Sequence, residues 1–179
     1  YYNAPAANGS IKYQYEYGIA IYKHFYANPS DPELKKTYVD TVMQIYDKRV
    51  ECFGEPAYIN GRKAFDYYYY FQEESDPETV YNLFKNAIDT KGEKSDYFVV
   101  NPFTKMLTDK VLEEEISLEE GSKYAMLLWS ILDYGTNSGK NKEAWEIINS
   151  YAPARLEILE GVKGIYDCDY YVSKYLPLY

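Results

Sequence analysis

Apolar side chains recur every three or four residues along most of the chain, with charged residues between them. Between Ser30 and Gly54, for example, Val42, Ile45 and Tyr46 fall on one side of a helix, while Lys48 and Glu51 fall on the other. This spacing is typical of an amphipathic α-helix. No window alternates at period two over more than a few residues, so the pattern predicts an all-α chain without a β-sheet.

Three helix start signals share one pattern. They are Ser30-Asp31-Pro32-Glu33, Ser75-Asp76-Pro77-Glu78 and Ser117-Leu118-Glu119-Glu120. Each fits a capping box, in which the serine oxygen accepts a hydrogen bond from the backbone amide three residues later. The signals are 45 and 42 residues apart, and a repeat of this length indicates stacked helix pairs.

Periodicity and turn residues together predict seven to eight helices. Their expected ranges are about 11–27, 30–53, 57–73, 75–90, 96–115, 118–134, 142–159 and 168–175. Pro153 should kink or interrupt the seventh helix, and residues 135–141 look the most flexible. The predicted fold is a right-handed α-α superhelix of antiparallel hairpins over one domain, 1–179, with helix pairs at about 11–53, 57–90, 96–134 and 142–175.

The first predicted helix differs from the others because it is apolar on two sides. One stripe contains Ile19, Tyr22 and Phe25, and the opposite side carries Tyr13, Tyr17, Ile21 and His24. A helix of this kind normally has neighbours on both sides. We therefore expect it to occupy an interior position in a stack that continues before this segment.

Two helices carry a pattern that resembles the tetratricopeptide repeat. Val80, Phe84 and Ala87 match the small–aromatic–small spacing of the second helix of that repeat, and Ala125, Trp129 and Leu132 follow the same spacing 45 residues later. The repeat length here is 42–45 residues, longer than the standard unit. The resemblance implies tetratricopeptide-like helix pairs.

A closer resemblance covers nearly the whole chain. The segments Tyr38–Arg49, Phe53-Gly54, Gly61–Asp66, Asp167–Asp169 and Tyr175–Leu178 resemble tetratricopeptide proteins of gut-dwelling anaerobic bacteria. That family implies an exported chain of the periplasm or cell envelope, with more repeats and with no catalytic residues. The chain begins Tyr1-Tyr2-Asn3 without an initiator methionine or signal peptide, so we expect it to be a fragment of a longer protein from which the targeting sequence is missing.

Charge and composition narrow the classes of partner. The net charge is −9 and no run of lysine or arginine exceeds two residues, which argues against nucleic acid because phosphate binding needs clustered cations. No stretch approaches the roughly 20 apolar residues that span a bilayer. Tyrosine is unusually frequent, at 24 of 179 residues, and suits interfaces that are apolar but partly wet.

Catalytic and metal chemistry find little support in the sequence. His24 is the only histidine, which excludes sites that need several imidazoles and favours a packed or hydrogen-bonded role for this residue. The segment Gly135–Asn141 resembles a phosphate-binding loop but is one residue short and follows a helix. We predict no enzyme activity, cofactor or metal. Cys52 and Cys168 are either buried or partly buried thiols or a disulfide, and the sequence leaves both open.

The candidate binding residues are Tyr13, Tyr17, Arg62, Asp66 and Tyr69. The tyrosines either form an exposed aromatic platform or pack on neighbouring repeats. Arg62 and Asp66 are four residues apart on a helix and form either a structural ion pair or, with Tyr69, part of a groove that holds a partner's carboxylate. Arg49 is placed to reach a carboxylate on the neighbouring helix.

The leading hypothesis for function is a non-catalytic helical-repeat scaffold that binds an unknown protein or peptide at the cell envelope. One alternative is a glycan- or nutrient-binding module that uses exposed tyrosines. Its weakness is that Trp129 and Trp145 lie at core-looking positions. A further alternative is a structural spacer of a longer solenoid.

Overall fold

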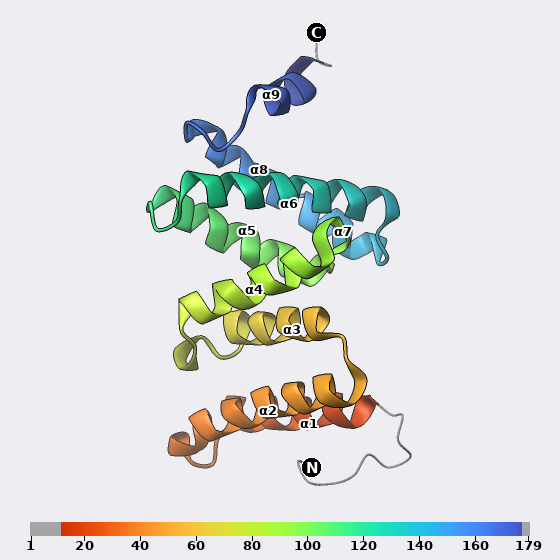
Figure 1. The fold of residues 1–179 in the computed structure, drawn as a ribbon. Coiled ribbons are helices and arrows are strands. Elements are labelled where there is room, and N and C mark those ends of the chain that lie inside the picture. Colours follow the sequence, from red (N-terminus) through yellow and green to blue (C-terminus); the bar gives the residue numbers. More distant parts are fainter. Residues whose placement is uncertain (1–11, 177–179) are drawn as a thin grey trace. The chain divides into compact units, whose positions relative to one another are not determined.

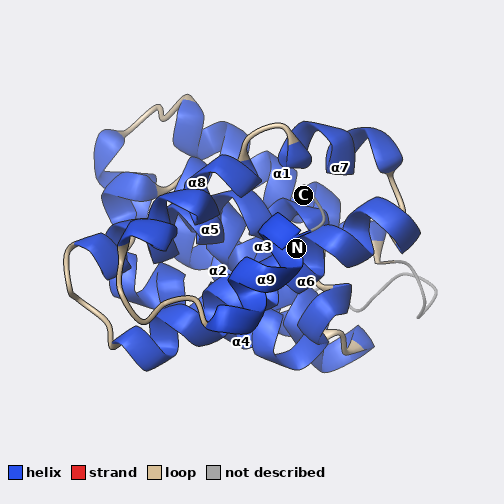
Figure 2. Ribbon diagram, turned by 90° about the horizontal axis from the view of Figure 1, so that it is seen from above, coloured by secondary structure: helices blue, strands red, loops and turns tan. Residues whose placement is uncertain are grey.

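The structure is a computed structural model that describes residues 12–176. Within this range the secondary structure is helical and contains no strand (Figures 1 and 2), which confirms the predicted all-α class. The helices in chain order are α1 (Tyr13–Ala27), α2 (Lys35–Phe53), α3 (Pro56–Tyr69), α4 (Pro77–Lys91), α5 (Tyr97–Leu112), α6 (Leu118–Ser138), α7 (Lys142–Asn149), α8 (Ala152–Ile158) and α9 (Cys168–Tyr175). Short 3-10 turns lie at Pro32–Leu34, Gln72–Glu74, Gly92–Lys94 and Leu159–Gly161.

The chain forms two compact units, Tyr1–Ala87 and Ile88–Tyr179. In the first unit, α1 and α2 lie side by side as an antiparallel hairpin (Figure 1), with Tyr15 beside Cys52 at one end and Tyr22 beside Tyr38 nearer the other. The buried core of this unit comprises Ile19, Tyr26, Val39, Val42, Met43, Ile45, Tyr46, Ile59 and Phe71. Burial of these side chains between α1, α2, α3 and the residue Phe71 that follows α3 is the main force that holds the unit together.

In the second unit, α5 is the central helix. It contacts α6 as well as α7 and α8, and Phe103 of α5 meets the ring of Tyr124 of α6 edge-on at 5.4 Å. Pro102 lies inside α5 and is buried. The side chains of Val100, Phe103 and Leu107 have no exposed surface, which agrees with a helix that is covered on several sides.

A cluster of tyrosines attaches α9 to the rest of the second unit. The rings of Tyr166 and Tyr170 stack at 3.9 Å, and the indole nitrogen of Trp129 donates a hydrogen bond to the Tyr166 hydroxyl at 3.2 Å. Glu160 accepts hydrogen bonds from Tyr170, from Tyr175 and from the ammonium group of Lys174. Burial alone would raise the pKa of Glu160, but these hydrogen bonds and the Lys174 charge lower it. Much of the tyrosine content of this unit is therefore used for packing and hydrogen bonding.

The first two predicted capping boxes are wrong in one detail: an aspartate caps the helix, not the serine before it. Asp31 accepts the amide hydrogen bond of Glu33 at 3.0 Å, and Asp76 accepts that of Thr79 at 2.9 Å. This shift of one residue places Pro32 at the first position of the 3-10 turn before α2 and Pro77 at the first position of α4, where a fixed φ and a missing N–H cost nothing. The third box is confirmed, since Ser117 accepts from the Glu120 amide at 3.1 Å.

Two features of the second unit depend on proline and glycine, namely the break between α7 and α8 and the packing at the end of α6. The predicted seventh helix is interrupted, as expected, into α7 and α8, with Pro153 in the first turn of α8. The segment 135–141, which looked the most flexible in the sequence, is helical up to Ser138, where α6 ends. A Cβ atom at Gly135 or Gly139 would lie 2.3 Å from the Trp145 indole, so both glycines serve close packing of this ring.

Several predicted buried faces are confirmed and others are not. Val80, Phe84, Ala87 and Ile88 of α4 are all buried, as are Ala125, Leu128 and Leu132 of α6. Phe25 was expected to be covered by a neighbouring helix but is exposed, and Leu34 and Cys52 are exposed as well. The predicted helix start at Asn8–Ser10 and the apolar residue Ile11 lie outside the described residues.

Candidate functional site

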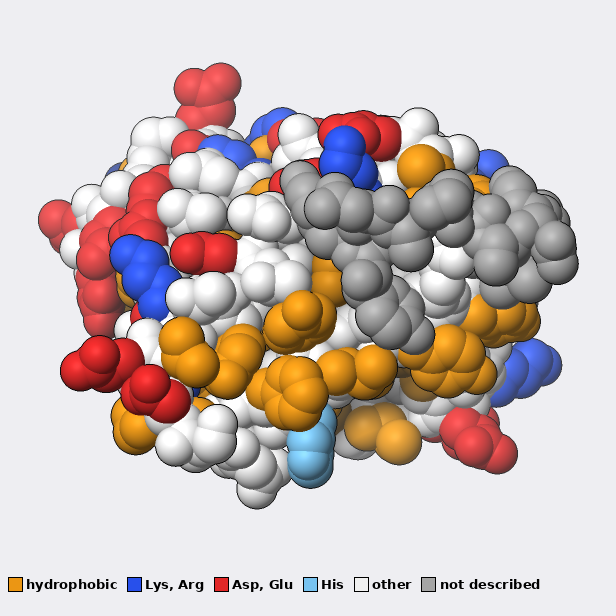
Figure 3. Space-filling model, turned by 90° about the horizontal axis from the view of Figure 1, so that it is seen from below, with side chains coloured by type: hydrophobic (Ala, Val, Ile, Leu, Met, Phe, Trp, Pro, Cys, Tyr) orange, Lys and Arg blue, Asp and Glu red, His pale blue; other side chains and the backbone are white. Residues whose placement is uncertain are grey.

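The first candidate surface is one face of α1. Tyr13 and Tyr17 lie one turn apart and are each 64% exposed, and Ile21 and Phe25 continue the same line at intervals of four residues. We call these four residues the α1 stripe. Figure 3 shows hydrophobic side chains gathered in a band beside His24, the pale blue side chain.

The α1 stripe corrects the expectation that both sides of this helix are covered. Gly18, Ile19 and Tyr26 are buried on the side that faces α2. His24 was expected to be packed or hydrogen-bonded, yet it is exposed, with its ring 6.3 Å from that of Phe25. An apolar helix face in contact with water is the feature that most needs a functional explanation.

Asp66 occupies a different environment from the one predicted. It has no exposed surface and accepts hydrogen bonds from the Tyr46 hydroxyl at 2.9 Å and from the ammonium group of Lys23 at 2.8 Å. Burial raises the pKa of Tyr46 far above its ordinary value, and the Asp66 carboxylate raises it further. Both carboxylate oxygens of Asp66 are therefore used inside the protein, and the groove role predicted for this residue has no free oxygen to offer.

Arg62 lies next to this buried network. Burial alone would lower the pKa of its guanidinium, but the interactions with the Tyr46 hydroxyl and with the Asp66 carboxylate outweigh burial and raise it. The guanidinium also lies 5.3 Å from the centre of the Phe65 ring. Arg62 thus lies beside the buried Asp66 network and also lines a cavity, described next.

A cavity of about 500 Å³ opens between α1, α2 and α3 in the first unit. Its wall includes Arg49 and Arg62, together with Glu16 and Lys23 of α1 and Tyr58 of α3. Sequence reasoning named the two arginines but missed Glu16, Lys23 and Tyr58. No local motif marks them, because they come together only when three helices pack.

Arg49 is the most unusual residue of this cavity. It is only 5% exposed, and its Nη2 atom lies 3.3 Å from a carboxylate oxygen of Glu55, so Arg49 does reach a carboxylate, but not one on the neighbouring helix as was predicted. That carboxylate belongs to the turn before α3, where Glu55 adopts a left-handed backbone with φ of 64°. The other two guanidinium nitrogens, Nε and Nη1, are buried without a hydrogen-bond partner.

Tyr69 lies at the end of α3 and is 41% exposed. Its ring centre is 4.6 Å from that of Phe65 and 4.8 Å from that of Tyr68, both on the same helix. Of the five candidate residues, the structure brings Arg62 and Asp66 together around Tyr46. Tyr13 and Tyr17 form the start of the α1 stripe, and Tyr69 packs on its own helix.

Other functional features are limited in the part of the chain that the structure describes. No group of three or more histidine, cysteine, aspartate or glutamate side chains is arranged to hold a metal ion among residues 12–176. No helix within these residues has the length and hydrophobicity needed to cross a bilayer. Cys52 and Cys168 do not form a disulfide, and both are exposed. The alternative of two free thiols is therefore correct, but the prediction that they are buried or partly buried is wrong.

Comparisons with family models, with characterised proteins and with solved structures give no match to this chain.

Proposed function

We propose that this chain is a non-catalytic helical-repeat scaffold that binds a protein or peptide through the α1 stripe. The observation that carries the proposal is the exposure of Tyr13, Tyr17, Ile21 and Phe25 along one face of one helix. Large apolar side chains that are ordered on a helix but open to water are typical of recognition surfaces.

The chemistry of the α1 stripe indicates the kind of partner. Tyrosine and phenylalanine bury a large area at low cost in side-chain entropy, and residues of this type supply most of the affinity at many interfaces. The net charge of −9 favours a partner whose apolar surface is bordered by basic residues. The expected ligand is therefore an amphipathic peptide segment with lysine or arginine at its edges.

A peptide-library selection tests this proposal. Peptides selected on the wild-type protein should lose at least about tenfold in affinity for a Tyr17→Ser/Ile21→Ser variant, because two central contacts are removed. Fluorescence anisotropy with labelled peptides measures the affinity, and far-UV circular dichroism checks that the helices remain. Selected peptides should be enriched in aromatic and basic residues.

The matched control is Ile147→Ser/Ile158→Ser, which removes two apolar side chains of similar exposure from the second unit. This control should bind the peptides as the wild type does. Equal affinity of all three proteins for every selected peptide would contradict a binding role for the α1 stripe. The cell-envelope location remains a prediction from the resemblance described above.

Glycan binding is a second candidate function, and one cavity in the second unit favours it. This cavity, of about 310 Å³, is lined by Tyr97, Tyr134, Trp145, Lys140 and Asn141 among others. Aromatic rings beside amide and ammonium groups suit a sugar, which has an apolar face and polar edges. Tryptophan fluorescence titrated with oligosaccharides should change in the wild type and not in Tyr97→Ala.

A further inference from the structure

The cavity around Arg49 contains a charge that the protein leaves only partly compensated. Nη2 is within 3.3 Å of Glu55, and the guanidinium carbon lies 5.3 Å from the centre of the Tyr58 ring. Nε and Nη1 have no hydrogen-bond partner although only 6% of the side chain is exposed. A buried polar group without a partner costs free energy, and the cost is larger when the group is charged. An acceptor in the cavity would remove that cost.

The charges around the cavity define the sign and size of the missing group. Lys23, Arg49, Arg62 and Glu16 line it, and ion pairs connect Asp66, Glu55 and Lys12 to these residues, so the group comprises four cations and three carboxylates. Lys12 and Arg49 share Glu55, and Asp66 accepts from Lys23. The balance is one positive charge, which a single negative charge neutralises. A dianion would meet repulsion from Glu16.

The rest of the cavity wall is apolar. Ile19 and Ala20 of α1 and Ile59 of α3 lie beside the charged groups. The volume of about 500 Å³ falls within the range of small-molecule sites. The site therefore offers a cationic end for a carboxylate and an apolar wall for a short hydrocarbon or aromatic body.

We propose that the Arg49 cavity binds a small amphiphilic monocarboxylate, with the carboxylate oxygens accepting from Arg49 and the apolar body against Ile19, Ala20 and Ile59. A guanidinium suits this role because it presents several N–H donors in a plane that matches a carboxylate. The inference is independent of the α1 stripe, since it rests on a different face of α1 and on residues of α2 and α3.

Calorimetric titration with four probes tests the chemistry of the site. Hexanoate has the head and the tail, hexanamide has the tail without the charge, acetate has the head without the tail, and inorganic phosphate is a different anion. Hexanoate should bind with a dissociation constant below about 10 mM, at least about tenfold tighter than each of the other three. The side-chain Nε–H resonance of Arg49 should shift when hexanoate is added.

Two variants locate the binding. Arg49→Met removes the donors and should weaken hexanoate binding at least about tenfold, while Arg155→Met, which removes the same charge from the second unit, should bind as the wild type does. Ala20→Phe is the second variant in case Arg49→Met does not fold. It fills the cavity from an exposed position of α1, leaves every charge in place and should also abolish binding.

Three results would overturn the inference. The first is the absence of saturable hexanoate binding to the wild type. The second is equal hexanoate affinity of the wild type and Ala20→Phe, which would place binding elsewhere. The third is binding of hexanamide or phosphate as tight as that of hexanoate, which would show that a carboxylate with an apolar tail is not what the cavity recognises.

Discussion

The hydroxyl group of Tyr46 on α2 donates a hydrogen bond of 2.9 Å to the carboxylate of Asp66 on α3, and Asp66 has no exposed surface. Lys23 of α1 donates to the other carboxylate oxygen at 2.8 Å. One carboxylate thus connects three helices of the first unit. Because a buried charge is stable only when it is paired and hydrogen-bonded, each donor is needed.

Removal of the Tyr46 hydroxyl should therefore destabilise the first unit. We expect Tyr46→Phe to lower the free energy of unfolding by about 1–3 kcal/mol, because Asp66 loses one of its two donors while the ring stays in place. Urea denaturation followed by circular dichroism measures the change. Tyr17→Phe removes a hydroxyl from an exposed ring and should have almost no effect. Equal midpoints for the two variants would contradict the role assigned to Tyr46.

The cap of α4 predicts that substitutions of the neighbouring residues Asp76 and Ser75 differ in their effect on stability. Asp76 accepts the amide hydrogen bond of Thr79 at 2.9 Å, whereas the Ser75 hydroxyl donates to the carbonyl of Gln72 at 3.3 Å. Asp76→Ala should lower the free energy of unfolding by about 1 kcal/mol, as the loss of an N-cap usually does. Ser75→Ala should cost clearly less. Chemical denaturation measures the free energy of unfolding of both variants. A larger loss in Ser75→Ala than in Asp76→Ala would show that Ser75 is the cap, as the sequence predicted.

The sequence predicted well what depends on neighbours along the chain. Helix existence follows from periodicity, so α4 has Val80, Phe84 and Ala87 buried as expected. Asp167 caps α9 by accepting from the Tyr170 amide at 2.9 Å, and α9 occupies the range 168–175 expected from the sequence. The caps at Asp31 and Asp76 were missed by a single residue, because serine and aspartate are almost equally good caps and only the helix start distinguishes them.

The sequence predicted poorly what depends on contacts between helices. Asp66 looked like a surface residue because its helix period places it opposite Ala64 and Tyr67, yet it is buried by Tyr46 and Lys23, which are 20 and 43 residues away. The buried position of Arg49 and the cavity beside it have the same origin. A polar residue that is buried by helices distant in the sequence leaves no signal in the local hydrophobic pattern. Its burial becomes visible only in the folded structure.

Because Trp145 packs closely against α6, adding one methyl group at Gly135 should lower the stability of the protein. A Cβ atom at Gly135 would lie 2.3–2.5 Å from the Trp145 ring, so Gly135→Ala forces the indole or the helix to move. We expect the free energy of unfolding to fall by about 1–3 kcal/mol, although alanine favours helix more than glycine does. Gly161→Ala is the control, because nothing lies within 4 Å of its added Cβ. A stabilised Gly135→Ala variant would mean that Trp145 does not pack there.

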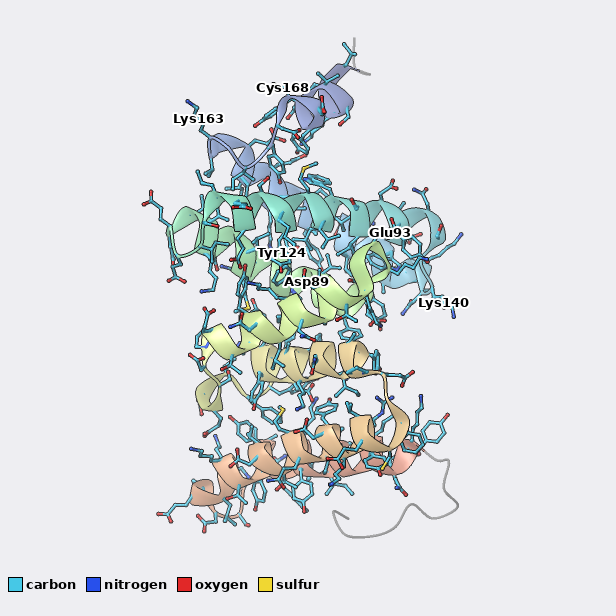
Figure 4. The ribbon with its side chains drawn as sticks, viewed as in Figure 1. Asp89, Glu93, Tyr124, Lys140, Lys163 and Cys168 are labelled. Carbon is cyan, nitrogen blue, oxygen red and sulfur yellow. The ribbon has the colours of Figure 1, made fainter. Side chains whose placement is uncertain are left out.

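Tyr124 of α6 predicts a specific loss of stability at high pH. Its hydroxyl donates to Asp89 at 2.7 Å, and the two residues lie next to each other in Figure 4. Burial raises the pKa of Tyr124 to about 12, and the hydrogen bond to Asp89 raises it as well, against an opposing effect of Lys123. The ordinary tyrosine value of 10.0 applies in the unfolded chain. The folded state therefore keeps this proton over a pH range in which the unfolded state loses it.

The sign of the pH dependence follows from this difference. The contribution of Tyr124 is fully present below pH 10 and is lost as the pH rises from 10 to about 12, because ionisation then favours the unfolded state. Urea denaturation at several pH values should show that stability falls with pH less steeply in Tyr124→Phe than in the wild type. The control is Tyr13→Phe, which removes a hydroxyl from a ring that is 64% exposed and should keep the steeper wild-type slope. Identical slopes for the wild type and Tyr124→Phe would contradict the proposed retention of the proton by Tyr124.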